Sequence, residues 1–132
     1  MKKRILCTAL LLCLVLTGLT SCANAPRTIV QIRNKADRMI EYWNRDDVRY
    51  CTNFYIAEYS DAEKTYSVHM HPLVSSETMM KYSVIQDTTD KIYSELHDAC
   101  FANRPDVKLL VYVYTYRGEC IYVYNGRKLT SV

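Results

Sequence analysis

His69 and His71 are the first side chains in the sequence whose spacing could support chemistry. They stand two residues apart at the end of an expected strand, Lys64–Met70, so they share one face of it. Some metal sites use that spacing, but zinc needs three or four protein ligands, and the third histidine, His97, falls in a distant expected helix. We expect no metal ion and no other cofactor; His69 and His71 are the residues that would bind a metal if one were held.

The N-terminal segment has the layout of a secretory signal peptide. A basic start, Lys2–Arg4, precedes an apolar run, Ile5–Leu19, and small residues follow. That run of 15 residues is shorter than the ~20 that cross a bilayer, which disfavours a permanent membrane span. Ordinary secretion after cleavage behind Ala25 is also disfavoured, because the cut would fall directly before Pro26.

The end of this segment, Leu19-Thr20-Ser21-Cys22, resembles the lipobox of bacterial lipoproteins. The resemblance implies that residues 1–21 are removed and that Cys22 becomes the N-terminus, with diacylglycerol on its sulfur. Two or more acyl chains hold a protein firmly at a bilayer, at ~0.8 kcal/mol per buried CH₂. We expect a lipid anchor on the extracytoplasmic side of the cell membrane, or on the outer membrane of a Gram-negative envelope because Ala23 follows the cysteine.

Removal of this segment changes the apparent composition. The chain has 17 Lys and Arg against 14 Asp and Glu; the loss of Lys2–Arg4 makes these counts equal, so nothing indicates nucleic-acid binding. Of six cysteines, Cys51, Cys100 and Cys120 remain for the domain. Their odd number and lack of CxxC spacing predict buried thiols, or one disulfide and a spare thiol.

Two amphipathic helices are expected. The first starts at Thr28, a suitable N-cap, and its apolar residues recur every three or four positions. The second lies within Ser75–Asn103 and ends before Pro105. A break in this helix near Tyr82 is also possible, because Ser83 is followed three residues later by Gln86, a capping box.

The segment between the helices fits two structures. Val48–Tyr59 is rich in Tyr, Phe, Thr and Ile, which favours the strand that we expect there, but its spacing also fits a helix. Met39–Tyr59 resembles the opening two helices of NTF2-like cone-shaped domains, in which an Asp starts the second helix. That resemblance implies an alternative, an α+β cone that binds a small molecule or acts as an enzyme in a tyrosine-lined cavity.

The C-terminal third predicts a β-meander. Strands are expected at Val107–Tyr116, Glu119–Tyr124 and Arg127–Ser131, with a strong hairpin signal at Asn125-Gly126. For the first turn we expect a three-residue loop that ends on a left-handed Gly118.

That loop would pair Val113 with Ile121 and separate two faces, one apolar and one rich in tyrosine. The predicted tyrosine face carries Tyr112, Tyr114, Tyr122 and Tyr124. Tyrosine is enriched at interfaces, because a rigid ring with a polar tip binds at little entropic cost; the same rings could instead pack under a helix. We expect these four tyrosines to bind a protein partner in the envelope.

Together these patterns predict one α+β domain at residues 29–132, on a tether at residues 22–28. Two long helices would pack on an antiparallel sheet in the order α-ββ-α-βββ. No glycine-rich phosphate loop or nucleophile motif is present. We therefore expect a lipid-anchored binding or scaffolding module rather than an enzyme.

Overall fold

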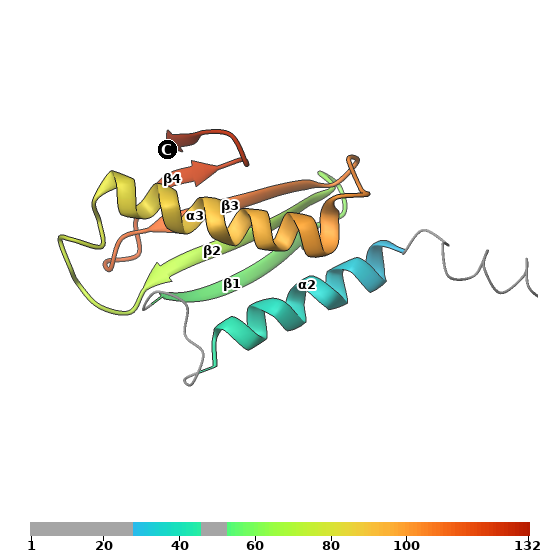
Figure 1. Ribbon diagram of the computed structural model, residues 1–132, viewed down its shortest axis with the longest axis horizontal. Helices are drawn as coiled ribbons and strands as arrows, with labels where there is room; N and C mark the ends of the chain where they lie inside the picture. Colours follow the sequence, from blue (N-terminus) through green and yellow to red (C-terminus); the bar gives the residue numbers. More distant parts are fainter. Residues whose placement is uncertain (1–27, 46–52) are drawn as a thin grey trace, which may run out of the picture.

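The computed structural model describes residues 28–45 and 53–132, which form an α+β domain (Figure 1). Its helices are α2 (Ile29–Trp43) and α3 (Tyr82–Leu96), and a short π-helical segment, η1 (His97–Phe101), continues α3. Its strands are β1 (Asn53–Ser60), β2 (Thr65–Pro72), β3 (Lys108–Tyr114), β4 (Cys120–Tyr124) and β5 (Leu129–Ser131). The element order agrees with the predicted α-ββ-α-βββ.

The five strands form one mixed sheet in the order β1-β2-β3-β4-β5. Three neighbouring pairs are antiparallel, but β2 and β3 are parallel. The expectation of an antiparallel sheet is therefore wrong at this pair. The reason is α3, which carries the chain from the end of β2 back along the sheet to the start of β3; such a crossover joins parallel neighbours, whereas short turns join antiparallel ones.

Helix α2 begins as predicted. Thr28 Oγ1 accepts a hydrogen bond from the Gln31 N–H at 3.3 Å, and Gln31 Oε1 accepts one from the Thr28 N–H at 3.1 Å, which completes a capping box. Its buried stripe consists of Ile32, Ala36, Ile40 and Trp43. At the other end, the side-chain amide of Asn44 bonds to both the N–H and the C=O of Tyr55, each at 2.7 Å, and so ties the helix to β1.

Helix α3 is shorter than expected. It starts at Tyr82, not near Ser75, and residues 77–80 form turns. The position of the possible break, near Tyr82, coincides with the start of α3. The N-cap is Lys81 and not Ser83, and its side chain makes no capping bond. The buried hydroxyl of Thr89 is satisfied within the helix, because it donates to the carbonyl of Ile85 at 2.9 Å.

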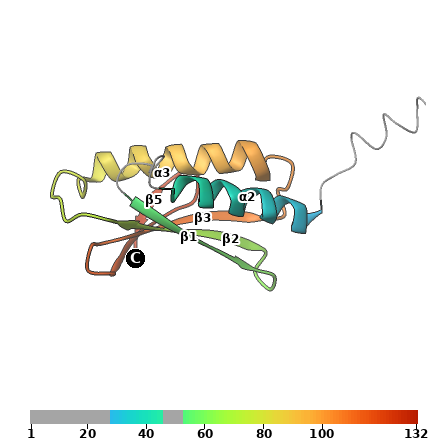
Figure 2. The same cartoon turned by 90° about the horizontal axis from the view of Figure 1, so that it is seen from below.

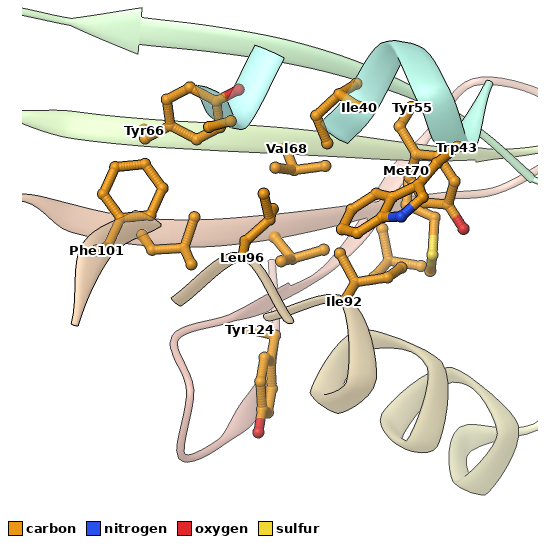
Figure 3. Packing of buried hydrophobic residues seen from close by; sticks show 14 of the residues in the cluster. Ile40, Trp43, Tyr55, Tyr66, Val68, Met70, Ile92, Leu96, Phe101 and Tyr124 are labelled. Atoms are coloured by element: carbon orange, nitrogen blue, oxygen red, sulfur yellow. The ribbon is translucent and has the colours of Figure 1, made fainter. Parts of the chain in front are cut away.

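Both helices cover the same face of the sheet, and no described helix covers the other (Figure 2). The core lies between these layers, and Tyr55, Tyr66, Ile92, Leu96 and Phe101 are among its largest fully buried side chains (Figure 3). The hydroxyl of Tyr66 donates to Asp37 Oδ1 of α2 at 2.6 Å. Burial and this carboxylate raise the pKa of Tyr66 well above its ordinary value, so the phenol stays neutral.

The strand preferred for the segment after α2 is confirmed, because Asn53–Ser60 is β1; the part of Val48–Tyr59 before Asn53 lies outside the described residues. An NTF2-like cone requires a second helix over this segment. The structure therefore does not support that alternative.

The turn between β3 and β4 has the predicted form at its tip and a different register below it. The Thr115 N–H donates to the Glu119 carbonyl at 2.8 Å, and Gly118 has a left-handed φ of 87°. Further along, however, Val113 pairs with Tyr122 and Tyr114 with Cys120, so β4 contains one extra residue. Such a bulge turns every following side chain to the opposite face, and the predicted pairing of Val113 with Ile121 is wrong.

Candidate functional site

Alternate residues of β1 to β4 lie on the face that carries no helix, which we call the open face. Its members are Phe54, Ile56, Glu58, Ser67, His69, His71, Leu110, Tyr112, Tyr114, Cys120 and Val123. Ile56 is 51% exposed and Phe54 37% exposed. Large apolar side chains that gather on an exposed surface are typical of an interaction site, which makes the open face the candidate site of this domain.

Three rings form a stacked row across the first three strands. Phe54 of β1 stacks on His71 of β2 with ring centroids 4.9 Å apart and an interplanar angle of 12°. His71 in turn stacks on Tyr114 of β3 at 4.2 Å and 19°. Cross-strand pairs of this kind stabilise a sheet, and they hold each ring in one orientation. The row therefore presents ring edges and polar tips at fixed positions.

A second row lies beside the first. His69 stacks on Tyr112 at 5.1 Å and 9°, and its Nδ1 lies 2.8 Å from the hydroxyl of Tyr114. Its Nε2 is buried without a hydrogen bond to any described residue, and the Glu58 carboxylate lies 3.7 Å away. That separation is longer than a hydrogen bond but allows ion pairing if the imidazole is protonated.

Three groups of the open face, His71, Tyr114 and Cys120, have pKa values shifted towards their neutral forms. Burial lowers the pKa of His71, and the neighbouring His69 lowers it further, so the His71 imidazole is neutral. Burial, together with Cys120 and Tyr112, raises the pKa of Tyr114. Burial also raises the pKa of Cys120, which leaves a protonated thiol that is a poor nucleophile. These groups can stack and hydrogen-bond, but they are not activated for covalent chemistry.

The two histidines that could have formed a metal site contact aromatic rings instead. His69 bonds to Tyr114 and His71 stacks on the same ring. His97 lies on η1, where it stacks on Tyr93 with centroids 5.8 Å apart. Within residues 28–45 and 53–132, no three His, Cys, Asp or Glu side chains gather closely enough to hold a metal ion.

The predicted tyrosine face is wrong for two of its four members. Tyr112 and Tyr114 lie on the open face, but Tyr122 and Tyr124 face α3, where Tyr122 contacts Tyr82 edge-on at 5.8 Å. Tyr124 is 4% exposed, and its hydroxyl donates to Asp90 Oδ1 of α3. The one-residue bulge is the cause, because it moves Tyr122 and Tyr124 to the helix side.

The two described cysteines make different sulfur contacts. Cys100 is half-buried beside Met39, with the two sulfur atoms 3.7 Å apart. The Cys120 thiol donates to the Tyr122 carbonyl at 3.8 Å. Cys51 and the expected lipidation site Cys22 lie outside the described residues.

The members of the open face that come from β1, namely Phe54, Ile56 and Glu58, were not singled out in the sequence. Their spacing of two was a usable signal, because alternate residues of a strand share a face. The signal was weakened because the spacing of Val48–Tyr59 also fits a helix. Only the pairing of β1 with β2 places Phe54 beside His71.

No helix in the described part of the chain is long and apolar enough to cross a bilayer. Searches against protein-family models, curated proteins and solved structures found no match.

Proposed function

We propose that this protein is a lipid-anchored protein of the bacterial cell envelope that binds a protein partner through its open face and catalyses no reaction. One observation carries the binding part of this proposal: stacked, neutral aromatic side chains occupy a sheet face that no described helix covers. Tyr122 and Tyr124 are not part of the proposed surface, because they pack against α3.

The stacked rows favour binding for an energetic reason. Each side chain immobilised at an interface costs about 0.5–1.5 kcal/mol, and the rings of Phe54, His71 and Tyr114 are already held by one another. Because His71 and Tyr114 are neutral near pH 7, a partner that covers them removes no charge from water. Burial of Ile56 and Phe54 would then contribute the apolar area that drives association.

The anchor part of the proposal rests on the sequence. Leu19-Thr20-Ser21-Cys22 fits a lipobox, and Thr28 follows Cys22 by six residues. Six residues span at most ~20 Å even when fully extended. An acylated Cys22 would therefore hold the domain close to the membrane surface, where a partner in the same envelope is within reach.

Photocrosslinking tests the binding surface. A benzophenone amino acid at Ile56 samples the open face, and the same residue at Tyr42 of α2 is a matched control, because both positions are 51% exposed. We expect a discrete adduct in cells from the Ile56 variant and none from the Tyr42 variant. Equal adducts from both positions, or none from Ile56 at wild-type expression level, would contradict binding through the open face.

The anchor is tested separately by Cys22→Ala. We expect mass spectrometry of the wild-type N-terminus to show an acylated Cys22, and the variant to leave the membrane fraction or to keep its leader. A wild-type protein that begins at another residue, or that carries no lipid, would remove the anchor from the proposal and leave the open face untouched.

A further inference from the structure

A hollow opens beside the aromatic rows, at the end of the open face nearest β5. Its volume is about 630 Å³, within the size range of small-ligand sites. Tyr112, Val123 and Thr130 form one cross-strand row of β3, β4 and β5 beneath it. With Leu110, the first two of these give the hollow an apolar floor.

Two cations stand at the edge of this floor. Lys108 begins β3, Arg127 lies in the turn between β4 and β5, and both line the hollow. No Asp or Glu is among the described residues that line it, and neither cation forms an ion pair within the described part of the chain. The nearby carboxylate of Asp106 forms a bidentate salt bridge with Arg104 instead, in which Arg104 Nε and Nη2 donate to the two carboxylate oxygens at 2.8 Å each. No described carboxylate is thus paired with Lys108 or Arg127.

The turn that carries Arg127 is held in place from both sides. The Asn125 side-chain oxygen accepts from the N–H groups of Arg127 and Lys128, at 3.1 and 3.0 Å. On the helix side, the Tyr93 ring packs directly on Gly126, where a Cβ atom would overlap it. Tyr93 therefore reaches the hollow from α3 and lines it as well, and a phenol there can donate a hydrogen bond to an anion.

We propose that this hollow binds a small organic anion. Its phosphate or carboxylate group would lie between Lys108 and Arg127, and its apolar part would rest on Leu110, Tyr112 and Val123. Charge-assisted bonds from Lys and Arg are the stronger class of polar contact, and the apolar floor selects against inorganic anions, which cannot use it. This site shares Leu110, Tyr112 and Val123 with the open face, but it requires neither the lipid anchor nor the proposed protein partner.

Phenyl phosphate is a suitable probe, because it carries both an anionic group and an apolar ring. Phenol lacks the charge and inorganic phosphate lacks the ring. The two fragments therefore separate the contribution of the cations, Lys108 and Arg127, to binding from that of the apolar floor. Using ligand-observed NMR on the full-length chain, we expect phenyl phosphate to bind at millimolar concentration and at least about tenfold more tightly than either fragment. Equal binding of inorganic phosphate, or no binding of phenyl phosphate, would overturn the proposal.

Variants locate the binding. The double substitution Lys108→Ala with Arg127→Ala should weaken phenyl phosphate about tenfold, the discount for solvent screening included. Lys128→Ala removes one positive charge from the turn that carries Arg127, but Lys128 does not line the hollow, so we expect less than a twofold change. An equal effect of both changes would show non-specific attraction and overturn the site. Lys108, Arg127 and Lys128 are all exposed, and circular dichroism checks that the variants fold.

Competition distinguishes a free anion from a lipid headgroup as the natural source of this chemistry. Vesicles with phosphatidylglycerol that displace phenyl phosphate, where phosphatidylcholine vesicles do not, would assign the hollow to an anionic lipid. Bound phenyl phosphate that resists both kinds of vesicle would assign it to a soluble anion. Both results require the site, whereas equal displacement by both vesicles would attribute the binding to the bilayer and contradict the proposal.

Discussion

The hydroxyl of Tyr114 lies 2.8 Å from Nδ1 of His69, and this contact joins β2 and β3 on the open face in addition to their ladder bonds. The same tyrosine ring stacks on His71, with centroids 4.2 Å apart. One side chain therefore positions both histidines, one by a hydrogen bond and the other by stacking. Tyr114 is the centre of the candidate site.

Tyr114→Phe should separate these two roles. The substitution keeps the ring that stacks on His71 and removes the hydrogen bond to His69, so we expect the free energy of unfolding to fall by about 1 kcal/mol. Urea denaturation measures this change. The control is Tyr112→Phe, because the Tyr112 hydroxyl makes no hydrogen bond with a described residue while its ring stacks on His69; there we expect less than about 0.5 kcal/mol. Equal losses would show that the bond to His69 contributes nothing.

The register of β4 can be tested with two alanine substitutions. Tyr124 is 4% exposed and bonds to Asp90, so Tyr124→Ala should cost about 3–5 kcal/mol, as for other buried aromatic residues. Tyr112 is half-buried on the open face, and Tyr112→Ala should cost about 1 kcal/mol. Thermal or urea unfolding compares them. Similar costs at the two positions would favour the register without a bulge, in which both tyrosines share a face.

The two glycines with positive φ form a matched pair. Gly118 and Gly126 have φ values of 87° and 88°, so Ala is strained at both, by about 1–2 kcal/mol. At Gly118 the added Cβ would meet nothing, but at Gly126 it would overlap the ring of Tyr93. We expect Gly126→Ala to be more destabilising than Gly118→Ala by at least about 1 kcal/mol.

A second background tests the cause of that difference. In Tyr93→Ala the ring is gone, so the cost of Gly126→Ala should fall to that of Gly118→Ala. An unchanged cost would show that the backbone, and not the contact with Tyr93, determines the requirement for glycine at this turn.

Acid should destabilise the domain through His71. Burial lowers its pKa in the folded state below the ordinary 6.5, so the unfolded chain binds a proton more readily than the folded chain. The contribution of His71 to the free energy of unfolding is fully present above pH 6.5. It is lost as the pH falls from 6.5 through the pKa of His71 in the folded state. Urea denaturation between about pH 7.5 and about pH 5 measures the loss.

His71→Gln should reduce this pH dependence, whereas His97→Gln, which removes an imidazole from η1, should retain it. Asp106 does not titrate in this pH range, because its hydrogen bonds with Arg104 hold its pKa at about 2. Its contribution to stability is lost only as the pH falls below 3.8, the ordinary pKa of the group. A His71→Gln variant with the full wild-type slope would assign the acid sensitivity to another group.

Local features of the fold could be predicted because they depend on neighbours in sequence. The N-cap at Thr28 depends only on residues up to three positions away. The apolar spacing up to Trp43 specifies a helix of one buried face. Gly118 at the tip of the β3–β4 turn follows from the conformations that only glycine adopts cheaply.

The tertiary structure decided how these elements pair and pack against one another. The bulge opposite Val113 cannot be predicted from the sequence of β4, because valine and tyrosine suit either face of a half-buried strand. Likewise, the residues of β2 do not predict that it lies parallel to β3, because that pairing depends on where α3 returns the chain. The sequence alone therefore determined the start of α2 and the tip of the β3–β4 turn, through short-range steric and hydrogen-bond preferences. Only long-range packing determined that Phe54, His69, His71 and Tyr114 share one face, because they come from three strands whose register is set by burial of the opposite face against the helices.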